Sequence, residues 1–188
     1  MPYFQNATSF LAQAIIGFAI YVVLLRFWMQ WVRADFRNEL GQFIIIVTNP
    51  VVIPLRKVLP SIKTLDTATL VLVFIIAFIK VFVFFALSSY GTPTLVLYLL
   101  MTLGVAIKYT IYLFIATIII QAVASWVNPH SHHPILSVAR SISEPILSPA
   151  RRLIPLIGGV DLSPILVLLF LQFSLKLIVS PLVRNFPI

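Results

Sequence analysis

The sequence predicts an all-α membrane protein in which four transmembrane helices form two tandem repeats of the same orientation, each with a cytoplasmic amphipathic helix at the membrane interface. Composition is the first observation: 61% of the 188 residues are hydrophobic and 10% are charged, whereas a soluble domain has about 25% charged residues. The second is a set of four apolar runs, each long enough to cross a bilayer. The third is a motif that occurs twice.

The repeated motif joins two apolar runs in each half of the chain. Each of its proline, basic and acidic positions recurs 95 residues later without a gap. The members are Pro50, Pro54, Arg56, Lys57, Pro60 and Asp66 in the first copy, and Pro145, Pro149, Arg151, Arg152, Pro155 and Asp161 in the second. We therefore expect a tandem duplication, with residues 1–90 forming the first repeat and residues 91–188 the second.

Each repeat contains two predicted spans of about 20 residues, the length that a bilayer core of about 30 Å requires. They cover residues 8–29 and 67–87 in the first repeat, and residues 105–124 and 163–183 in the second. An even number of spans per repeat makes the two copies point the same way. No cationic segment precedes the first run, so we expect a retained helix and not a signal peptide. Residues 94–104 are apolar but lie outside the repeat pattern, and both a half-helix and a tilted extension of the third span fit them.

A shorter amphipathic helix is predicted before each copy of the motif. In the first copy, apolar residues follow the helical spacing i, i+3, i+4, i+7 at Leu40, Phe43, Ile44 and Val47. The second copy has a similar pattern from Ile135 onward. A helix of this kind lies in the membrane interface. We expect it to be too short to span the bilayer and to end in a proline-rich turn.

The basic residues are concentrated between the two spans of each repeat. The net charge is +8, and the two loops carry Arg33, Arg37, Arg56, Lys57, Lys63, Arg140, Arg151 and Arg152. Membrane proteins keep such loops in the cytoplasm. We therefore expect a multi-pass protein of the bacterial plasma (inner) membrane, with both long loops cytoplasmic and both termini on the opposite side. The same placement argues against a nucleic-acid partner and favours the lipid bilayer as the partner.

Each copy of the motif also supplies candidate site residues near a predicted helix start. The candidates for capping the following span or binding an ion are Asp66, Asp161 and Ser163. The candidates for closing the turn by pairing with an aspartate, or for binding the headgroups of anionic phospholipids, are Arg56, Lys57, Arg151 and Arg152. The two basic roles can coexist.

Polar residues within the spans form a second group of candidates: Lys80, Lys176, Gln172 and Gln121. A charge in the bilayer is costly, so an intramembrane lysine indicates either a side chain that snorkels to the interface or an interior functional position. We expect Lys80 to snorkel because its neighbours are apolar. We expect Lys176 to face the interior because Gln172 shares its helix face. Gln121 lies in a polar stripe of the kind that marks helix packing.

Nothing in the sequence indicates catalysis, a cofactor or a metal. The chain has no cysteine, and neither a Gly-rich phosphate loop nor a Ser/His/Asp set is recognisable. His130, His132 and His133 have no cysteine or adjacent carboxylate to complete a metal site. We therefore expect a non-enzymatic protein.

Residues 151–165 resemble the signature of the YggT family, also called the YlmG family, with Arg, Pro, Gly, Asp, Ser and Pro at the family's spacing. The length and layout of the chain match the bacterial two-repeat form. The first copy departs from the signature at residues 63–64 and 68–69. The resemblance implies an integral inner-membrane protein. Bacterial members are linked to osmotic tolerance and ion homeostasis, other relatives to cell-division gene clusters, and plastid relatives to cytochrome maturation and nucleoid organisation.

Two functions are therefore compared. The leading hypothesis is a membrane protein that contributes to osmotic stress tolerance and ion homeostasis, either by conducting ions or by modulating another transporter. The alternative is a membrane scaffold or assembly factor that contacts other membrane proteins through its cytoplasmic Pro/Arg/Asp loops. A transport role needs the intramembrane lysines to line a common cleft, whereas a scaffold role does not.

Overall fold

The computed structural model describes residues 2–62, 65–88, 91, 93–127, 133–153 and 161–183. These residues are helical apart from turns and one isolated β-bridge between Ile62 and Leu65. The helices are α1 (Pro2–Trp31), α2 (Glu39–Val58), α3 (Thr67–Leu87), α4 (Leu95–Val127), α5 (Pro134–Leu153) and α6 (Ser163–Ser174). The last helix continues through a π-helical turn, η1 (Leu175–Val179), into α7 (Ser180–Val183). The all-α class predicted from the sequence is confirmed over this part of the chain.

Five helices among the described residues are long and apolar enough to cross a membrane: Ala7–Trp31, Glu39–Val58, Thr67–Leu87, Leu95–Ser125 and Ser163–Val183. Four of them contain the four predicted spans. The fifth is α2, which we expected to be too short. Its 20 residues extend about 30 Å at 1.5 Å per residue, so length does not exclude it, and that expectation was wrong.

Residues 95–104 belong to the third predicted span. They form the beginning of α4, an uninterrupted helix of 33 residues, which is about 50 Å long. A separate half-helix is therefore wrong, and the extension of the third span is correct. Gly104 lies where α4 meets α7, and a Cβ atom there would come within 2.8 Å of Leu182. The small residue allows this close approach.

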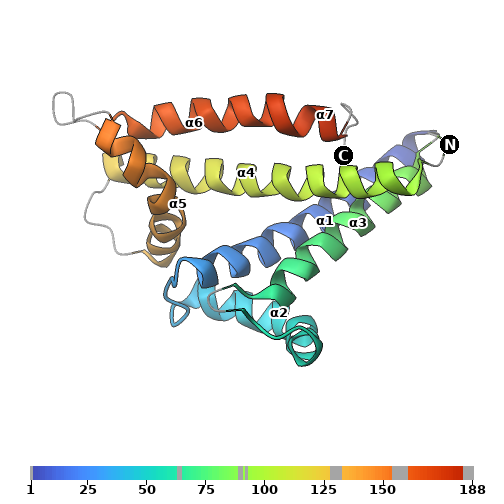
Figure 1. The fold of residues 1–188 in the computed structure, drawn as a ribbon, viewed down its shortest axis with the longest axis horizontal. Helices are drawn as coiled ribbons and strands as arrows, with labels where there is room; N and C mark the ends of the chain where they lie inside the picture. Colours follow the sequence, from blue (N-terminus) through green and yellow to red (C-terminus); the bar gives the residue numbers. More distant parts are fainter. Residues whose placement is uncertain are drawn as a thin grey trace.

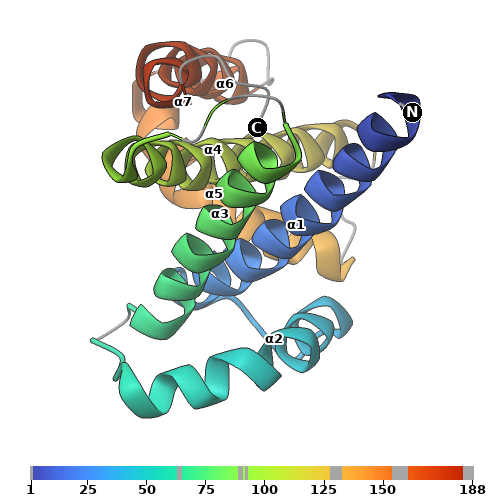
Figure 2. The same ribbon diagram turned by 90° about the vertical axis from the view of Figure 1, so that its right-hand side faces the viewer.

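The prolines of the motif lie inside helices, which corrects the predicted proline-rich turn. Pro50 and Pro54 are within α2, and Pro145 and Pro149 are within α5. Each proline removes one backbone donor and pushes away the carbonyl four residues earlier, which bends a helix without ending it when packing holds both sides. Figure 2 shows α2 bent along its length. The turn begins only after the helix ends at Val58.

The long helices share an arrangement in the two halves of the chain. α1 packs against α3, and α6 runs along α4 (Figure 1). α2 lies across the ends of α1 and α3, and α5 lies at the corresponding ends of α4 and α6 (Figures 1 and 2). The start of α1, the end of α3, the start of α4 and α7 gather at the opposite side of the molecule (Figure 1).

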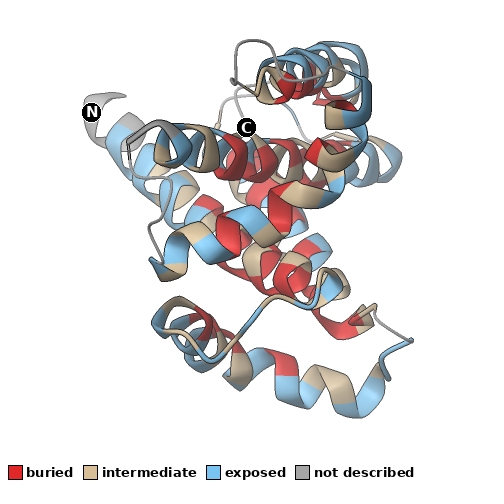
Figure 3. Cartoon of the chain, turned by 90° about the vertical axis from the view of Figure 1, so that its left-hand side faces the viewer, coloured by how far each residue is buried: buried red, intermediate tan, exposed pale blue. Residues whose placement is uncertain are grey.

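The core lies where these helices meet, and the outer faces are apolar. Figure 3 shows buried residues on the facing sides of the helices and exposed residues outside. Large exposed hydrophobic side chains include Phe10, Phe82, Leu169 and Phe170. A soluble monomer rarely exposes extended apolar surface, so the outside of these helices suits lipid. The arrangement places α2 and α5, with their basic and acidic residues, at one end of the long helices.

Candidate functional site

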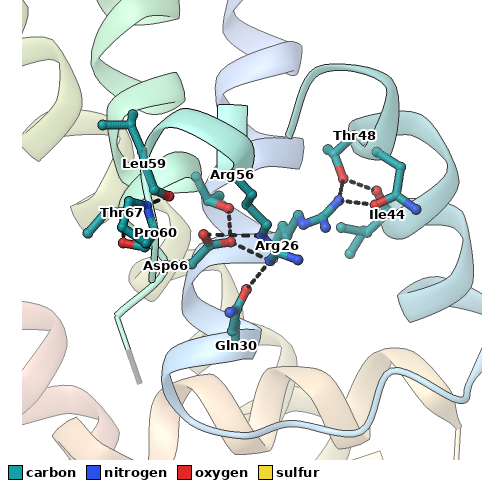
Figure 4. A network of polar contacts seen from close by, with 11 residues as sticks. Arg26, Gln30, Ile44, Thr48, Arg56, Leu59, Pro60, Asp66 and Thr67 are labelled. Carbon is teal, nitrogen blue, oxygen red and sulfur yellow. Dashed lines mark hydrogen bonds and ion pairs between the residues drawn. The ribbon is translucent and has the colours of Figure 1, made fainter. Parts of the chain in front are cut away.

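The first candidate site is a polar cluster that joins the end of α2 to the start of α3 (Figure 4). Arg56 Nη2 donates to Asp66 Oδ2 at 2.6 Å, and Arg56 Nε lies 3.4 Å from Asp66 Oδ1. The Thr69 hydroxyl donates to the same carboxylate. The Asp66 side chain has 0% exposure, whereas that of Arg56 is 37% exposed. The Arg–Asp ion pair expected from the motif is therefore present, with its acidic member buried.

Asp66 does not cap the helix backbone with its side chain. It occupies the position before α3, but its carboxylate makes no side-chain capping hydrogen bond. The carboxylate instead accepts hydrogen bonds from the side chains of Arg56 and Thr69. Burial raises the pKa of Asp66, and the hydrogen bonds from Arg56 and Thr69 outweigh that effect and leave the pKa below its usual value. The carboxylate is charged at neutral pH, and its role is to hold α2 onto α3.

Arg26, on α1, is the residue of this cluster that sequence reasoning missed. It is 4% exposed. Its Nη1 donates to the Thr48 hydroxyl and, at 2.9 Å, to Asn49 Oδ1 (Figure 4). Gln30 Oε1 accepts from Arg56 Nη2 at 3.1 Å. A lone arginine inside an apolar run was the available signal, since a buried cation needs partners. We call Arg26, Thr48, Asn49, Arg56 and Asp66 the first cluster.

The second cluster occupies the same place in the second repeat, between α5 and α6. Arg151 Nε donates to Asp161 Oδ2 at 2.8 Å, and Arg151 Nη1 donates to both oxygens of Glu144 at 2.8 and 2.9 Å. Asp161 Oδ1 accepts from the Ser163 backbone N–H at 2.9 Å. Asp161 thus satisfies one free N–H group at the start of α6, while the Ser163 hydroxyl is buried and has no partner among the described residues.

The charges of the second cluster stabilise one another. Burial lowers the pKa of Arg151, and the hydrogen bonds that it donates to Asp161 and Glu144 raise it by more, so the net shift is upward. Burial raises the pKa of Asp161, and the hydrogen bonds from Ser163 and Arg151 bring it below the usual value. Arg151 is 36% exposed and Asp161 is 30% exposed. This cluster is therefore more accessible to water and salt than the first.

The two clusters correspond position by position through the shift of 95 residues. Gln121 takes the place of Arg26, and its Oε1 accepts from the Ser143 hydroxyl, as Thr48 meets Arg26 in the first repeat. Glu144 takes the place of Asn49. The complete second cluster is Gln121, Ser143, Glu144, Arg151 and Asp161. The first cluster has two guanidinium groups for one carboxylate, and the second has two carboxylates for one guanidinium.

A pocket of about 250 Å³ opens beside the second cluster. Its lining includes Gln121, Ser125, Arg151 and Asp161 at the polar side, and aliphatic residues of α4 and α6 elsewhere. Two further basic residues of the motif are exposed: Lys57, next to Arg56 in α2, and Arg152, next to Arg151 in α5. Contact of these two residues with anionic phospholipids stays a prediction.

The intramembrane lysines are placed opposite to our expectation. Lys80 is 3% exposed, and its Nζ donates to Gln13 Oε1 at 2.6 Å and to the Gln13 carbonyl at 3.1 Å. It also lies 5.7 Å from the Tyr109 ring centroid. Lys176 and Gln172 are exposed, and no hydrogen bond or ion pair joins Lys176 to another described residue. Lys80 therefore does not snorkel, and Lys176 does not face the interior.

The repeat register explains both errors. The shift of 95 places Leu175, not Lys176, at the position of Lys80. Leu175 is 8% exposed and points inward, as Lys80 does. Lys176 is one residue later in the same turn, so its side chain points to a different face of the helix. The two lysines consequently lie on different faces and line no common cleft.

No group of three or more metal-binding side chains occurs in the part of the chain that the structure describes. His130 and His132 lie outside the described residues. The features that define the described residues are instead long apolar helices, the helices α2 and α5 across their ends, and an Arg–Asp pair that occurs twice. They describe an all-helical protein with several helices that are long and apolar enough to cross a membrane.

Comparisons with known proteins agree with this class and specify the family. The family model CCB3/YggT matches residues 5–87 and again residues 100–182, so the chain belongs to the CCB3/YggT family. The uncharacterized protein YggT of Escherichia coli (strain K12) is 36% identical over 171 residues, which cover 89% of this chain and 86% of that protein. An uncharacterized protein of Vibrio alginolyticus is 37% identical over 171 residues, covering 90% and 92%. No solved structure shows significant similarity to the chain.

Proposed function

We propose that the protein contributes to osmotic stress tolerance and ion homeostasis in the bacterial inner membrane, as a non-enzymatic modulator of transport. The observation that carries this proposal is the second cluster, in which Arg151 ties α5 to the start of α6 through partly exposed ion pairs. Salt weakens exposed ion pairs more than buried ones. A rise in cytoplasmic ionic strength would loosen α5 while the first cluster, with Asp66 buried, still holds α2.

The proposed topology has four transmembrane helices and two interfacial ones. The buried residues of α2 are Gly41, Ile44, Thr48 and Val52, which follow helical spacing and define one inner face. Arg56 and Lys57 lie in its last turn, and two prolines bend it. A charged, bent helix that covers the ends of its neighbours suits the interface. Its basic residues favour the cytoplasmic side.

Modulation is favoured over ion conduction because of the two lysines. Lys80 is bound to Gln13 in the interior, and Lys176 is exposed on the outer face of the last helix. A pathway built on both would need them to share one cleft. The proposal therefore gives the cytoplasmic helices, and their contacts with anionic phospholipids, the regulatory role.

A deletion strain complemented with variants tests this function. Wild-type protein and an Arg152→Gln variant should restore growth after an osmotic upshift, because Arg152 is exposed and outside the ion pairs. Arg151→Gln should fail at the same protein level, because it removes both pairs of the second cluster. Equal growth of the Arg151→Gln and wild-type strains would contradict the proposal. Ion flux through purified protein in liposomes would instead support conduction.

An assembly factor is the second candidate, and the outer face of α2 favours it. Phe43, Ile46, Val47 and Ile53 are about half exposed or more, and they form an apolar surface at the end of the bundle. Photo-crosslinking from a probe at Phe43 in cells, with and without a change at Ile46, separates the two candidates. Reproducible crosslinks to one membrane protein, lost in an Ile46→Ser variant together with growth, would favour assembly, whereas crosslinks to lipid alone would not.

A further inference from the structure

The pocket beside the second cluster has a polar end and an apolar wall. It lies between α4, α5 and α6 and has a volume of about 250 Å³. Gln121, Arg151 and Asp161 form the polar end. The wall includes Ile119 and Ile165, which are 46% and 55% exposed, so it opens onto the outer, lipid-facing surface. A small hydrophilic molecule would leave most of this wall without a partner.

The free acceptor capacity of the polar end favours a group that donates hydrogen bonds. Arg151 is shared between Glu144 and Asp161, so one guanidinium faces two carboxylates. A carboxylate oxygen accepts more than one hydrogen bond, and each of the Asp161 oxygens accepts one from within the protein. Acceptor capacity is therefore left on Asp161 at the pocket, where Arg151 and Asp161 are the charged lining residues and balance each other.

In the first repeat, the position equivalent to Gln121 holds a cationic residue. There Arg26 replaces Gln121, and its guanidinium donates to Thr48 and Asn49. The first cluster thus carries, on its own chain, a cationic donor where the second cluster has a neutral glutamine and a pocket. An ammonium group of a ligand in the pocket would place a cationic donor beside Gln121, the residue that replaces Arg26 in the second repeat.

We propose that this pocket binds one zwitterionic aminophospholipid. Its ammonium group lies between Asp161 and Gln121, and its phosphate lies toward the exposed Arg152. One acyl chain follows the apolar wall between α4 and α6. An anionic lipid such as phosphatidylglycerol brings no ammonium donor for the Asp161 oxygens. A free metal cation would leave the apolar wall without a partner, and the positive charge of Arg151 at the pocket would repel it. The proposal does not depend on the function proposed above.

Lipid retention tests the site directly. Purified protein is reconstituted in nanodiscs with equal amounts of phosphatidylethanolamine, phosphatidylcholine and phosphatidylglycerol, and retained lipids are counted by native mass spectrometry. Wild-type protein should retain one phosphatidylethanolamine in preference to the other two. Phosphatidylcholine is a sharp comparison because its trimethylammonium group is cationic but has no N–H donor. Gln121→Arg should reduce this retention about tenfold, the effect of losing one charged hydrogen bond.

Matched variants keep the test decisive. Gln172→Arg adds the same charge on the exposed face of α6 and should retain the lipid as wild type does. If Gln121→Arg unfolds, the triple variant Gln121→Arg, Ser143→Thr, Glu144→Asn reproduces the first cluster and should fold with the pocket filled. Unchanged retention in either folded variant would refute the site, as would a preference for phosphatidylglycerol. Equal competition by free ethanolamine would show a soluble amine site instead and would also refute it.

Discussion

Lys80 is a charged residue in the middle of a membrane helix, and its hydrogen-bond partners are neutral. Its ammonium group meets the side-chain and backbone oxygens of Gln13 and the ring of Tyr109. An unpaired charge in the membrane interior costs several kcal/mol, so these contacts partly replace water. Gly17 makes room for the arrangement, because a Cβ atom there would lie 2.6 Å from the Tyr109 hydroxyl.

Lys80 and Gln13 should be energetically coupled. A double-mutant cycle with Lys80→Met and Gln13→Leu should give a coupling energy of about 1–3 kcal/mol in the unfolding free energy, since Gln13→Leu removes the side-chain partner of the buried Lys80 ammonium group. The measurement is unfolding of the detergent-solubilised protein by SDS. Lys176→Met, on an exposed residue, is the control and should change stability by less than about 0.5 kcal/mol. Additive single effects would mean that the contact contributes nothing.

The two aspartates should differ in their response to neutralisation. Asp66 is buried and bound by Arg56 and Thr69, so Asp66→Asn should cost about 1.5–3 kcal/mol. Asp161 is 30% exposed, and an asparagine there can still accept the Ser163 N–H, while Arg151 keeps Glu144. Asp161→Asn should therefore cost less than about 1 kcal/mol. Thermal unfolding at equal detergent concentration compares them, and equal losses would contradict the different burial of the two clusters.

Acid should destabilise the protein through the same carboxylates. The pKa of Asp66 and that of Asp161 are both below the reference value of 3.8. A lowered folded pKa gives stability that is complete above the unfolded pKa and is lost as the pH falls through the folded value. The unfolding free energy should thus be constant above about pH 5 and fall below pH 4. Asp66→Asn should flatten this decline. An unchanged slope in that variant would show that other titrating groups cause the acid sensitivity.

At the scale of elements, the prolines of α2 set the direction in which its last turn points. The helix continues through Pro50 and Pro54, and its bend carries Arg56 to Asp66 at the start of α3. A straight helix would project its last turn elsewhere. α5 contains the equivalent pair, Pro145 and Pro149. In both repeats, a helix with two internal prolines therefore carries the arginine that pairs with an aspartate.

Replacing both prolines of α2 by alanine should straighten it. Alanine restores the two missing backbone donors and removes the ring clash. Spin labels at Phe43 and Val58, which are 50% and 77% exposed, should move apart in the Pro50→Ala, Pro54→Ala variant. Pulsed electron paramagnetic resonance measures the separation. An unchanged distance would show that packing on α1 and α3, and not the prolines, bends the helix.

At the scale of the whole molecule, both clusters lie at one end of the long helices, and we predict that this end is cytoplasmic. Because the chain has no cysteine, single cysteines report the topology. Ser61 and Ser137 are exposed near α2 and on α5, and Gly91 is exposed between α3 and α4. An impermeant thiol reagent on intact spheroplasts should label Gly91→Cys alone. Permeabilised cells, in which all three should react, are the control, and labelling of Ser61→Cys in intact cells would reverse the orientation.

Several features followed from the sequence because they depend on local chemistry. An apolar stretch of 20 residues in a chain with few charges forms a helix, since only internal hydrogen bonding satisfies its backbone in lipid. The repeat, the positions of the long helices and the Arg–Asp pairs could all be read from a motif that recurs at one spacing. The arginine and aspartate of each pair are ten residues apart, so one turn brings them together.

Only the tertiary structure decided which side chains face inward. The helices α1 and α4 are apolar nearly all round, so their sequence periodicity does not identify a buried face. Helix packing placed Lys80 beside Gln13, which is 67 residues away in the chain, and left Lys176 outside. Packing also kept α2 and α5 helical through their prolines and buried Arg26 beneath α2. These outcomes depend on contacts between distant segments, which one residue pattern does not contain.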